Sequence, residues 1–118
     1  MIELRHKNLK VWKMAMEFVT KIYELTKNFP KEEIYSLTSQ IKRSAVSIPS
    51  NIAEGSARSS INERRRFYEI SRSSLVELDT QLEIALILNY CCQEDIDEIS
   101  KQMNHLFALI SKLIKSTK

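Results

Sequence analysis

A regular stripe of apolar residues crosses a proline in the middle of the chain. Around the segment SLTSQIKRSAVSIPSNIAEGSA (36–57), apolar residues recur every three or four positions, at Ile34, Leu37, Ile41, Ala45, Ile48 and Ile52. This spacing is typical of one face of an α-helix, and it keeps its phase on both sides of Pro49. A proline inside a helix costs about 3 kcal/mol, so packing of this face must offset that cost. The pattern predicts one helix that continues through Pro49 with a kink and is ended by Gly55 in the left-handed conformation.

Gly55 is also the only glycine in the 118 residues, and the chain has only two prolines. So little turn chemistry disfavours a protein of many strands, and a composition of 43% hydrophobic and 28% charged residues is typical of a globular domain. The sequence therefore predicts one all-α domain over residues 1–118. No apolar run reaches the ~20 residues of a membrane span, and the charged start lacks the apolar core of a signal peptide. We expect no membrane contact and a cytoplasmic location.

Three further helices follow from similar patterns. The first is expected over residues 9–28 with Asn8 as N-cap, the third over residues 60–90, and the fourth from about Glu94. The third is expected to begin with a capping box of Ser60 and Glu63. Its inward residues are predicted to be Phe67, Ile70, Ser71, Ser74, Leu75, Leu78, Leu82 and Ala85. Four helices with short links predict an up-down-up-down antiparallel four-helix bundle.

Two segments carry more apolar surface than one bundle uses. The first helix is apolar over roughly 200° of its circumference, where one buried side needs little more than 100°. Near its end the third helix becomes apolar all round, over residues 84–88, which predicts burial on every side. Both features predict a homo-oligomer. A bundle with one broad core face, and Trp12 and Tyr23 at its edges, remains the alternative.

Groups for catalysis are scarce. His6 and His105 are the only imidazoles and are expected at the surface or its edge, and the single glycine excludes phosphate-binding glycine loops. No metal-ligand spacing occurs, so no cofactor, metal or catalytic residue is predicted. The adjacent cysteines Cys91 and Cys92 are interpreted as reduced thiols, with a vicinal redox pair as the alternative. The many serines are interpreted as small residues that let helices approach closely, and Asn51 as a partly buried residue bonded to a neighbour's backbone.

Charge is unevenly placed along the chain. Between Ser73 and Ser100 there are seven carboxylates and no Lys or Arg. In an antiparallel bundle the other end gathers both termini and the second turn, and with them Arg5, Lys7, Lys10, Arg58, Arg64, Arg65, Arg66, Arg72, Lys112, Lys115 and Lys118. Clustered Arg beside Phe67 and Tyr68 suits phosphate contacts with some base stacking. The candidate nucleic-acid-binding residues are Arg58, Arg64, Arg65, Arg66, Arg72, Lys112 and Lys115.

Three segments carry a family resemblance: LKVWKMAMEFVTKIYELTKNFP, LTSQIKRSAVSIPSNIAEG and RRFYEISRSSLVELDTQLEIA. Together they resemble the four-helix-bundle proteins encoded in intervening sequences of bacterial 23S ribosomal RNA genes. The resemblance implies a family motif formed by Ser47, Pro49, Ser50, Asn51, Glu54 and Gly55. The chain is more loosely similar to the accessory protein of diversity-generating retroelements, a basic pentameric barrel that binds a reverse transcriptase and nucleic acid. That similarity implies a homopentameric ring and a protein partner such as a reverse transcriptase.

Two interpretations of function share this fold. In the first, the protein is a non-enzymatic oligomer that binds RNA or DNA through its basic end. In the second, it is a protein-binding or structural ring whose basic end serves only solubility, since many basic surfaces bind nothing. Binding to RNA or heparin that weakens with salt separates the two.

Overall fold

The chain consists of four long α-helices and two short 3₁₀ helices. The computed structural model describes residues 1–118 and contains no strand. The elements, in order, are η1 (Arg5–Asn8), α1 (Lys10–Thr26), η2 (Lys31–Glu33), α2 (Leu37–Ser56), α3 (Ile61–Ile87) and α4 (Gln93–Ser116). The all-α prediction is therefore confirmed.

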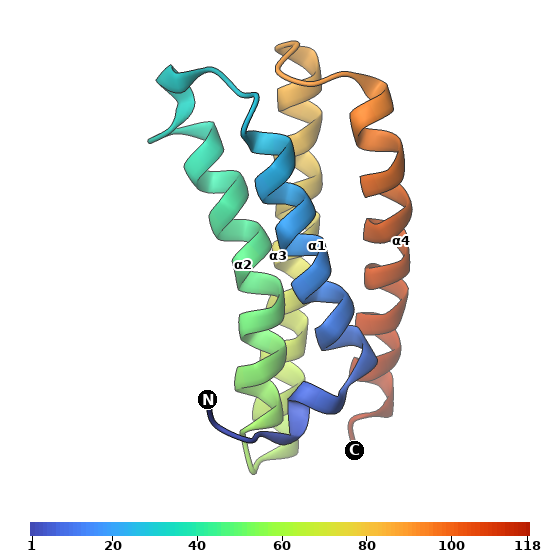
Figure 1. Cartoon of the computed structure of the whole chain (residues 1–118). Helices are drawn as coiled ribbons and strands as arrows, with labels where there is room; N and C mark the ends of the chain where they lie inside the picture. Colours follow the sequence, from blue (N-terminus) through green and yellow to red (C-terminus); the bar gives the residue numbers. More distant parts are fainter.

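The four helices lie side by side, and each runs opposite to the one before it (Figure 1). Helix α1 packs against α2 and α4, and α3 packs against the same two helices, with the most extensive contact between α2 and α3. Both termini and the α2–α3 connection lie at one end, called the basic end below (Figure 1). The α1–α2 and α3–α4 connections lie at the other, called the acidic end.

The predicted apolar faces meet in one continuous core. Its fully buried large side chains come from all four helices: Phe18, Ile22, Ile41, Ile48, Ile52, Leu78, Leu106 and Ile110. The stripe of α2 supplies three of them. Its first member is an exception, because Ile34 precedes the helix and is 48% exposed. The prediction that Ile34 belongs to the buried face is wrong, since the short η2 helix intervenes and α2 begins only at Leu37.

Helix α2 continues through Pro49, as the unbroken phase of the stripe predicted. The predicted role of Gly55 is wrong. Gly55 lies inside α2, is buried, and has no positive φ. The left-handed residue of the chain is instead Asn89, with φ 60°. It ends α3 in a Schellman motif, in which the amide of Tyr90 bonds the carbonyl of Ala85 and the amide of Asn89 bonds that of Leu86.

Serine side chains line the contact between α2 and α3. The Ser71 hydroxyl donates to the Ile48 carbonyl at 2.8 Å, and the hydroxyls of Ser47 and Ser74 lie 2.8 Å apart. Each bond joins the two helices directly. The interpretation of these serines as small residues that allow close approach is confirmed at this contact. A buried hydroxyl that bonds a backbone carbonyl also stabilises the pair by about 1 kcal/mol.

The helix starts differ in part from the predictions. Helix α1 follows Leu9 with no side-chain cap, so the prediction that Asn8 caps it is wrong; Asn8 belongs to η1. Ser60 caps α3 by accepting from the Glu63 amide at 3.3 Å, one of the two bonds of the predicted box. A full capping box that was not predicted begins α4, where the thiol and amide of Cys92 both donate to the Asp95 carboxylate.

The third helix buries a slightly different face from the one predicted. Tyr68 is buried in place of Phe67, which is half-buried, and Ile70 is exposed. The apolar segment at the end of α3 is not buried on every side in the single chain, because Ile87 is 76% exposed and Ile84 and Leu88 are also exposed. Near that end no other helix of the chain covers these side chains.

Candidate nucleic-acid interface

The basic end is built from parts of the chain that lie far apart in the sequence. The segment before α1, the α2–α3 connection and the end of α4 meet there (Figure 1). The antiparallel order of the helices therefore gathers the predicted cations at one end. The predicted nucleic-acid-binding residues, however, differ in how free their charges are.

Arg58 lies in the α2–α3 connection and is partly engaged. Its guanidinium lies 3.2 Å from the carboxylate of Glu54, four residues earlier. The same group stacks over the ring of Phe67, 4.8 Å from its centroid. Since both partners are exposed, the ion pair contributes little to stability. The arginine thus lies over an aromatic ring and is itself exposed.

Arg64 and Arg65 lie in the first turns of α3 and differ in the hydrogen bonds that they form. The Arg64 Nε donates to the Arg58 carbonyl at 2.9 Å, which leaves its two terminal nitrogens free. Arg65 donates to the carbonyl of Thr117 and thereby ties the start of α3 to the end of α4. Its Nε is buried without a partner. Arg65 is therefore part of the packing between helices, and substituting it tests the fold more than ligand binding.

Arg72 lies further along α3, away from the tip of the basic end. It donates to the Ser111 hydroxyl at 3.1 Å, and its guanidinium lies 5.8 Å from the centroid of Phe107. Glu69, three residues before Arg72 and four after Arg65, forms no ion pair with either. Arg72 thus joins α3 to α4 and presents only part of its charge to solvent.

Arg66, Lys112 and Lys115 are the freest cations of the predicted set. All three are exposed, and none makes an ion pair or a side-chain hydrogen bond within the chain. Arg66 comes from α3, and the two lysines come from the last turns of α4. Together they form a set of exposed positive charges that phosphate groups can reach.

The acidic end is more internally paired. Lys21 of α1 lies 3.0 Å from Glu98 of α4, and Ser44 donates to Glu77 at 2.7 Å. The Tyr90 hydroxyl donates to Glu33 at 2.6 Å. This bond lowers the pKa of Glu33 and raises the pKa of Tyr90. It fastens the α1–α2 connection to the α3–α4 connection.

The residues of the family motif are mostly structural. Asn51 is half-buried, as predicted, but its amide donates to the carbonyl and hydroxyl of Ser47 in its own helix, so a bond to a neighbour's backbone is not formed. Pro49 is buried, and Glu54 pairs with Arg58 as described above. Ser50 is exposed. Gly55 packs against α3. The motif therefore shapes the contact of α2 with its neighbours.

His6 is not at the surface, contrary to the sequence-based expectation. It is only 7% exposed, and its ring meets the Trp12 ring edge-on at 5.1 Å between centroids. The short helix η1 folds back over α1 and brings the two together. Burial lowers the pKa of the His6 imidazole, and the nearby Lys7 ammonium lowers it further. His105 is exposed, as expected.

Cys91 and Cys92 are free thiols in the α3–α4 connection. Burial raises the pKa of the Cys91 thiol, and the charge of Asp95 raises it further. The bonds from Cys92 lower the pKa of Asp95. A thiol with a raised pKa is a poor nucleophile and metal ligand at neutral pH. This favours the interpretation of Cys91 as an inert thiol.

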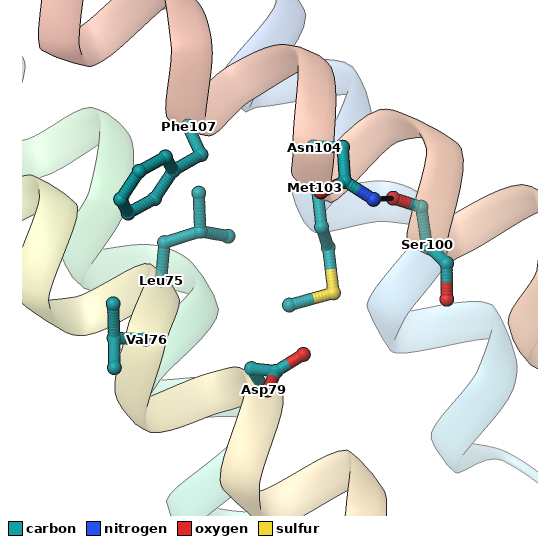
Figure 2. Close-up of a pocket in the computed structure, with 7 residues that line it drawn as sticks. All are labelled: Leu75, Val76, Asp79, Ser100, Met103, Asn104 and Phe107. Atoms are coloured by element: carbon teal, nitrogen blue, oxygen red, sulfur yellow. Dashed lines mark hydrogen bonds between the residues drawn. The ribbon is translucent and has the colours of Figure 1, made fainter.

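A shallow groove of about 330 Å³ separates α3 and α4 in the middle of the molecule. Figure 2 shows Leu75, Val76 and Phe107 gathered on one side of it, with Ser100 and Asn104 on the other and Asp79 at its lower edge. Val76 and Phe107 are exposed. The groove thus combines apolar and neutral polar side chains with a single carboxylate, which suits contact with another protein surface better than contact with nucleic acid.

No group of three or more His, Cys, Asp and Glu side chains is placed to hold a metal ion. The helices do not include one with the length and apolar character of a membrane span.

Comparison with known proteins identifies the family. No curated protein matches the chain. The family model described as "23S rRNA-intervening sequence protein" matches residues 7–112, which cover all of α1, α2 and α3 and most of α4. The match includes the Pro49 segment of α2 and most of the basic end. The chain therefore belongs to the family of 23S rRNA-intervening sequence proteins.

Proposed function

We propose that the protein is a non-enzymatic nucleic-acid-binding protein whose basic end contacts the phosphate backbone. The observation that carries the proposal is the set of free cations at that end. Arg66, Lys112 and Lys115 come from two helices, are exposed, and have no partner within the chain. Each cation that neutralises a phosphate releases a counterion, which drives binding independently of sequence.

An aromatic ring at the basic end supports the same function. The guanidinium of Arg58 lies over the ring of Phe67, 4.8 Å from its centroid. Planar guanidinium groups and aromatic rings are the surfaces on which unpaired bases stack. We therefore expect a preference for single strands and little preference for sequence.

Fluorescence anisotropy with labelled RNA and DNA, single- and double-stranded, tests this function at low salt. Binding to all four, with the single strands bound more tightly, is expected. Failure to bind any of them at low salt would overturn the proposal. The protein-binding interpretation would then take its place.

We further propose that the chain assembles into a ring of identical subunits. Two separate surfaces support this. One is a groove of about 350 Å³ between α1 and α2, lined by Trp12, Met16, Val46 and Pro49 among others. The other is the α3–α4 groove described above. Two different apolar surfaces on one subunit suit a head-to-tail contact, which closes into a ring when the rotation permits. The resemblance to pentameric accessory proteins suggests five subunits.

A bend of α2 at Pro49 belongs to this proposal. The proline removes one helix hydrogen bond and crowds the carbonyl of Ala45. Because Pro49 also lines the α1–α2 groove, a bend there shapes the surface that the next subunit meets. Light scattering that gives a stable mass of 13.8 kDa at micromolar concentration would contradict the ring.

A protein-binding ring is the second candidate function, and the α3–α4 groove favours it. Its apolar lining and its single carboxylate, Asp79, suit a helix that carries one basic residue. A partner such as a reverse transcriptase is suggested by the looser resemblance to retroelement accessory proteins. Substituting Val76→Asp and measuring both subunit mass and nucleic-acid affinity separates this surface from the basic end.

A further inference from the structure

A small pocket at the basic end differs from the open surface around it. It has a volume of about 230 Å³ and lies where four parts of the chain meet: η1, the end of α2, the start of α3 and the end of α4. The polar residues that line it include Arg5, His6, Ser56, Arg64, Tyr68 and Lys118. It is thus a half-open hollow formed by residues from both ends of the chain and from its middle.

The charges in this pocket are of one sign. Arg5, Arg64 and Lys118 line it, and no Asp or Glu side chain does. The three ion pairs in the protein involve other cations, namely Lys21, Lys27 and Arg58. The three pocket cations therefore have no carboxylate partner. An anion that enters the pocket would be compensated by charges that are otherwise unpaired.

Neutral hydrogen-bond donors add to these charges. The hydroxyls of Ser56 and Tyr68 lie 2.9 Å apart, so one donates to the other. The accepting hydroxyl keeps its own proton and can donate it to a ligand. Arg64 uses only its Nε within the protein, which leaves four N–H groups at its terminal nitrogens. The pocket therefore combines a forked donor with a hydroxyl, a set that suits phosphate oxygens.

His6 offers a further donor. The imidazole lines this pocket, packs against Trp12 and makes no side-chain hydrogen bond within the protein. Its ring nitrogens are not among the fully buried polar atoms that lack a partner, so they are not sealed from solvent. A phosphate oxygen in the pocket can accept a hydrogen bond from the imidazole N–H.

We infer that this pocket binds a phosphate monoester, and specifically a phosphate at the end of a nucleic-acid strand. The inference rests on the proposed function and specifies a ligand for it. A phosphate within a strand has a nucleotide on both sides and needs an open groove. A half-open pocket of about 230 Å³ accommodates one group that is attached on one side. A monoester also carries more negative charge near neutral pH than an internal phosphodiester does, which favours it among three unpaired cations.

The test compares strands that differ only at their ends. Fluorescence anisotropy is measured with one 12-nucleotide RNA bearing a 5′-phosphate, a 3′-phosphate or hydroxyls at both ends. A terminal phosphate is expected to tighten binding about tenfold, the effect of one or two charge-assisted hydrogen bonds. The 5′ and 3′ forms show which end the pocket accepts.

Two variants locate the effect. Arg5→Ala with Arg64→Ala should abolish the preference for a terminal phosphate. The matched control is Arg66→Ala with Lys112→Ala, which removes the same charge from the same end but outside the pocket. The control should weaken binding of all three strands equally and keep their ratio. An equal loss of the preference in both double variants would overturn the inference.

A separate measurement distinguishes failure of the pocket from failure of the proposed function. Inorganic phosphate is added to the free protein, and the His6 ring signals are followed by NMR, with His105 as the internal reference. A shift of the His6 signals that saturates and is absent in the Arg5→Ala, Arg64→Ala variant is expected. If RNA binds equally well with and without a terminal phosphate and His6 does not respond, the pocket inference is wrong while the proposed function stands. If no RNA binds, the proposed function fails, and the response of His6 still decides whether the pocket holds phosphate.

Discussion

Gly55 and Tyr68 pack so closely that a β-carbon at position 55 would lie 2.8 Å from Cε1 of the Tyr68 ring. It would also lie 3.1 Å from the carbonyl oxygen of Arg64. The only glycine of the chain is thus required by the approach of α3 to α2. Tyr68 in turn bonds Ser56 and lines the phosphate pocket inferred above. The close packing fixes one wall of that pocket.

Gly55→Ala should therefore destabilise the protein. Forcing an extra carbon into a packed core costs about 1–3 kcal/mol, and the better helix propensity of alanine returns about 1 kcal/mol. A net loss of up to about 2 kcal/mol in the free energy of unfolding is expected from chemical denaturation. In a Tyr68→Leu background the same change should cost less, because only the close approach to the Arg64 carbonyl remains. An equal loss in both backgrounds would show that the contact with Tyr68 is not the cause.

Ser71→Ala tests the contact between α2 and α3. Ser71 is fully buried and donates to the Ile48 carbonyl, so its loss should cost about 0.5–1.5 kcal/mol of unfolding free energy. Ser73→Ala is the matched control, because Ser73 lies on the exposed side of the same helix. The control should change the free energy of unfolding by less than about 0.5 kcal/mol. Equal losses in the two variants would show that the hydrogen bond from Ser71 to Ile48 does not stabilise the contact.

These two contacts show where the sequence was informative and where it was not. The three-and-four spacing of apolar residues located all four helices and most of the core, because burial of one face imposes that period. The same spacing includes Tyr68, three positions before Ser71, but the prediction placed Phe67 on the buried face of α3 instead. The role of Gly55 was not predictable, because it depends on a ring that another helix brings close. Local spacing near a helix end suggested a left-handed cap instead.

The candidate site shows the same division. Charge counting along the chain located the basic end, since antiparallel helices must bring the termini and the second turn together. It treated Arg65 and Arg66 alike, although Arg65 bonds the Thr117 carbonyl and Arg66 is free. Nor did it show that His6 folds back onto Trp12. The packing of α4 against α3 decides which arginine side chain forms a hydrogen bond. The spacing of residues in the sequence does not predict that packing.

Stability should fall as the pH is lowered below the ordinary histidine pKa of 6.5. Burial lowers the pKa of His6 in the folded protein, and the Lys7 ammonium lowers it further. The unfolded chain then binds more protons than the folded one, so the free energy of unfolding decreases as pH falls. His6→Phe should reduce this slope between about pH 7.5 and 5.5. A slope in His6→Phe equal to that of the wild type would refute the assignment.

Pro49→Ala separates the destabilising effect of a proline inside α2 from its proposed role in the contact between subunits. Replacing proline with alanine is favourable by about 3 kcal/mol in helix propensity, partly because it restores a helix hydrogen bond. The loss of buried ring carbon is unfavourable by about 1.6 kcal/mol. Thermal unfolding should therefore shift upward by a few degrees. If the bend shapes the surface between subunits, light scattering should at the same time show a smaller average mass. A lower melting temperature, or a higher one with the mass unchanged, would contradict the proposed role of the bend.

The most direct test of the account is the salt dependence of nucleic-acid binding in two charge-matched variants. The first, Arg66→Ala, Lys112→Ala, Lys115→Ala, removes three free cations from the basic end. The control, Lys27→Ala, Lys31→Ala, Lys101→Ala, removes the same net charge from outside the basic end. Plots of log K against log salt concentration are expected to be steep for the wild type and the control. They should be shallower by roughly 2 to 3 for the first variant, since each phosphate contact contributes about 0.7 to 0.9. Equal slopes in the two variants would contradict the claim that the basic end is the nucleic-acid interface.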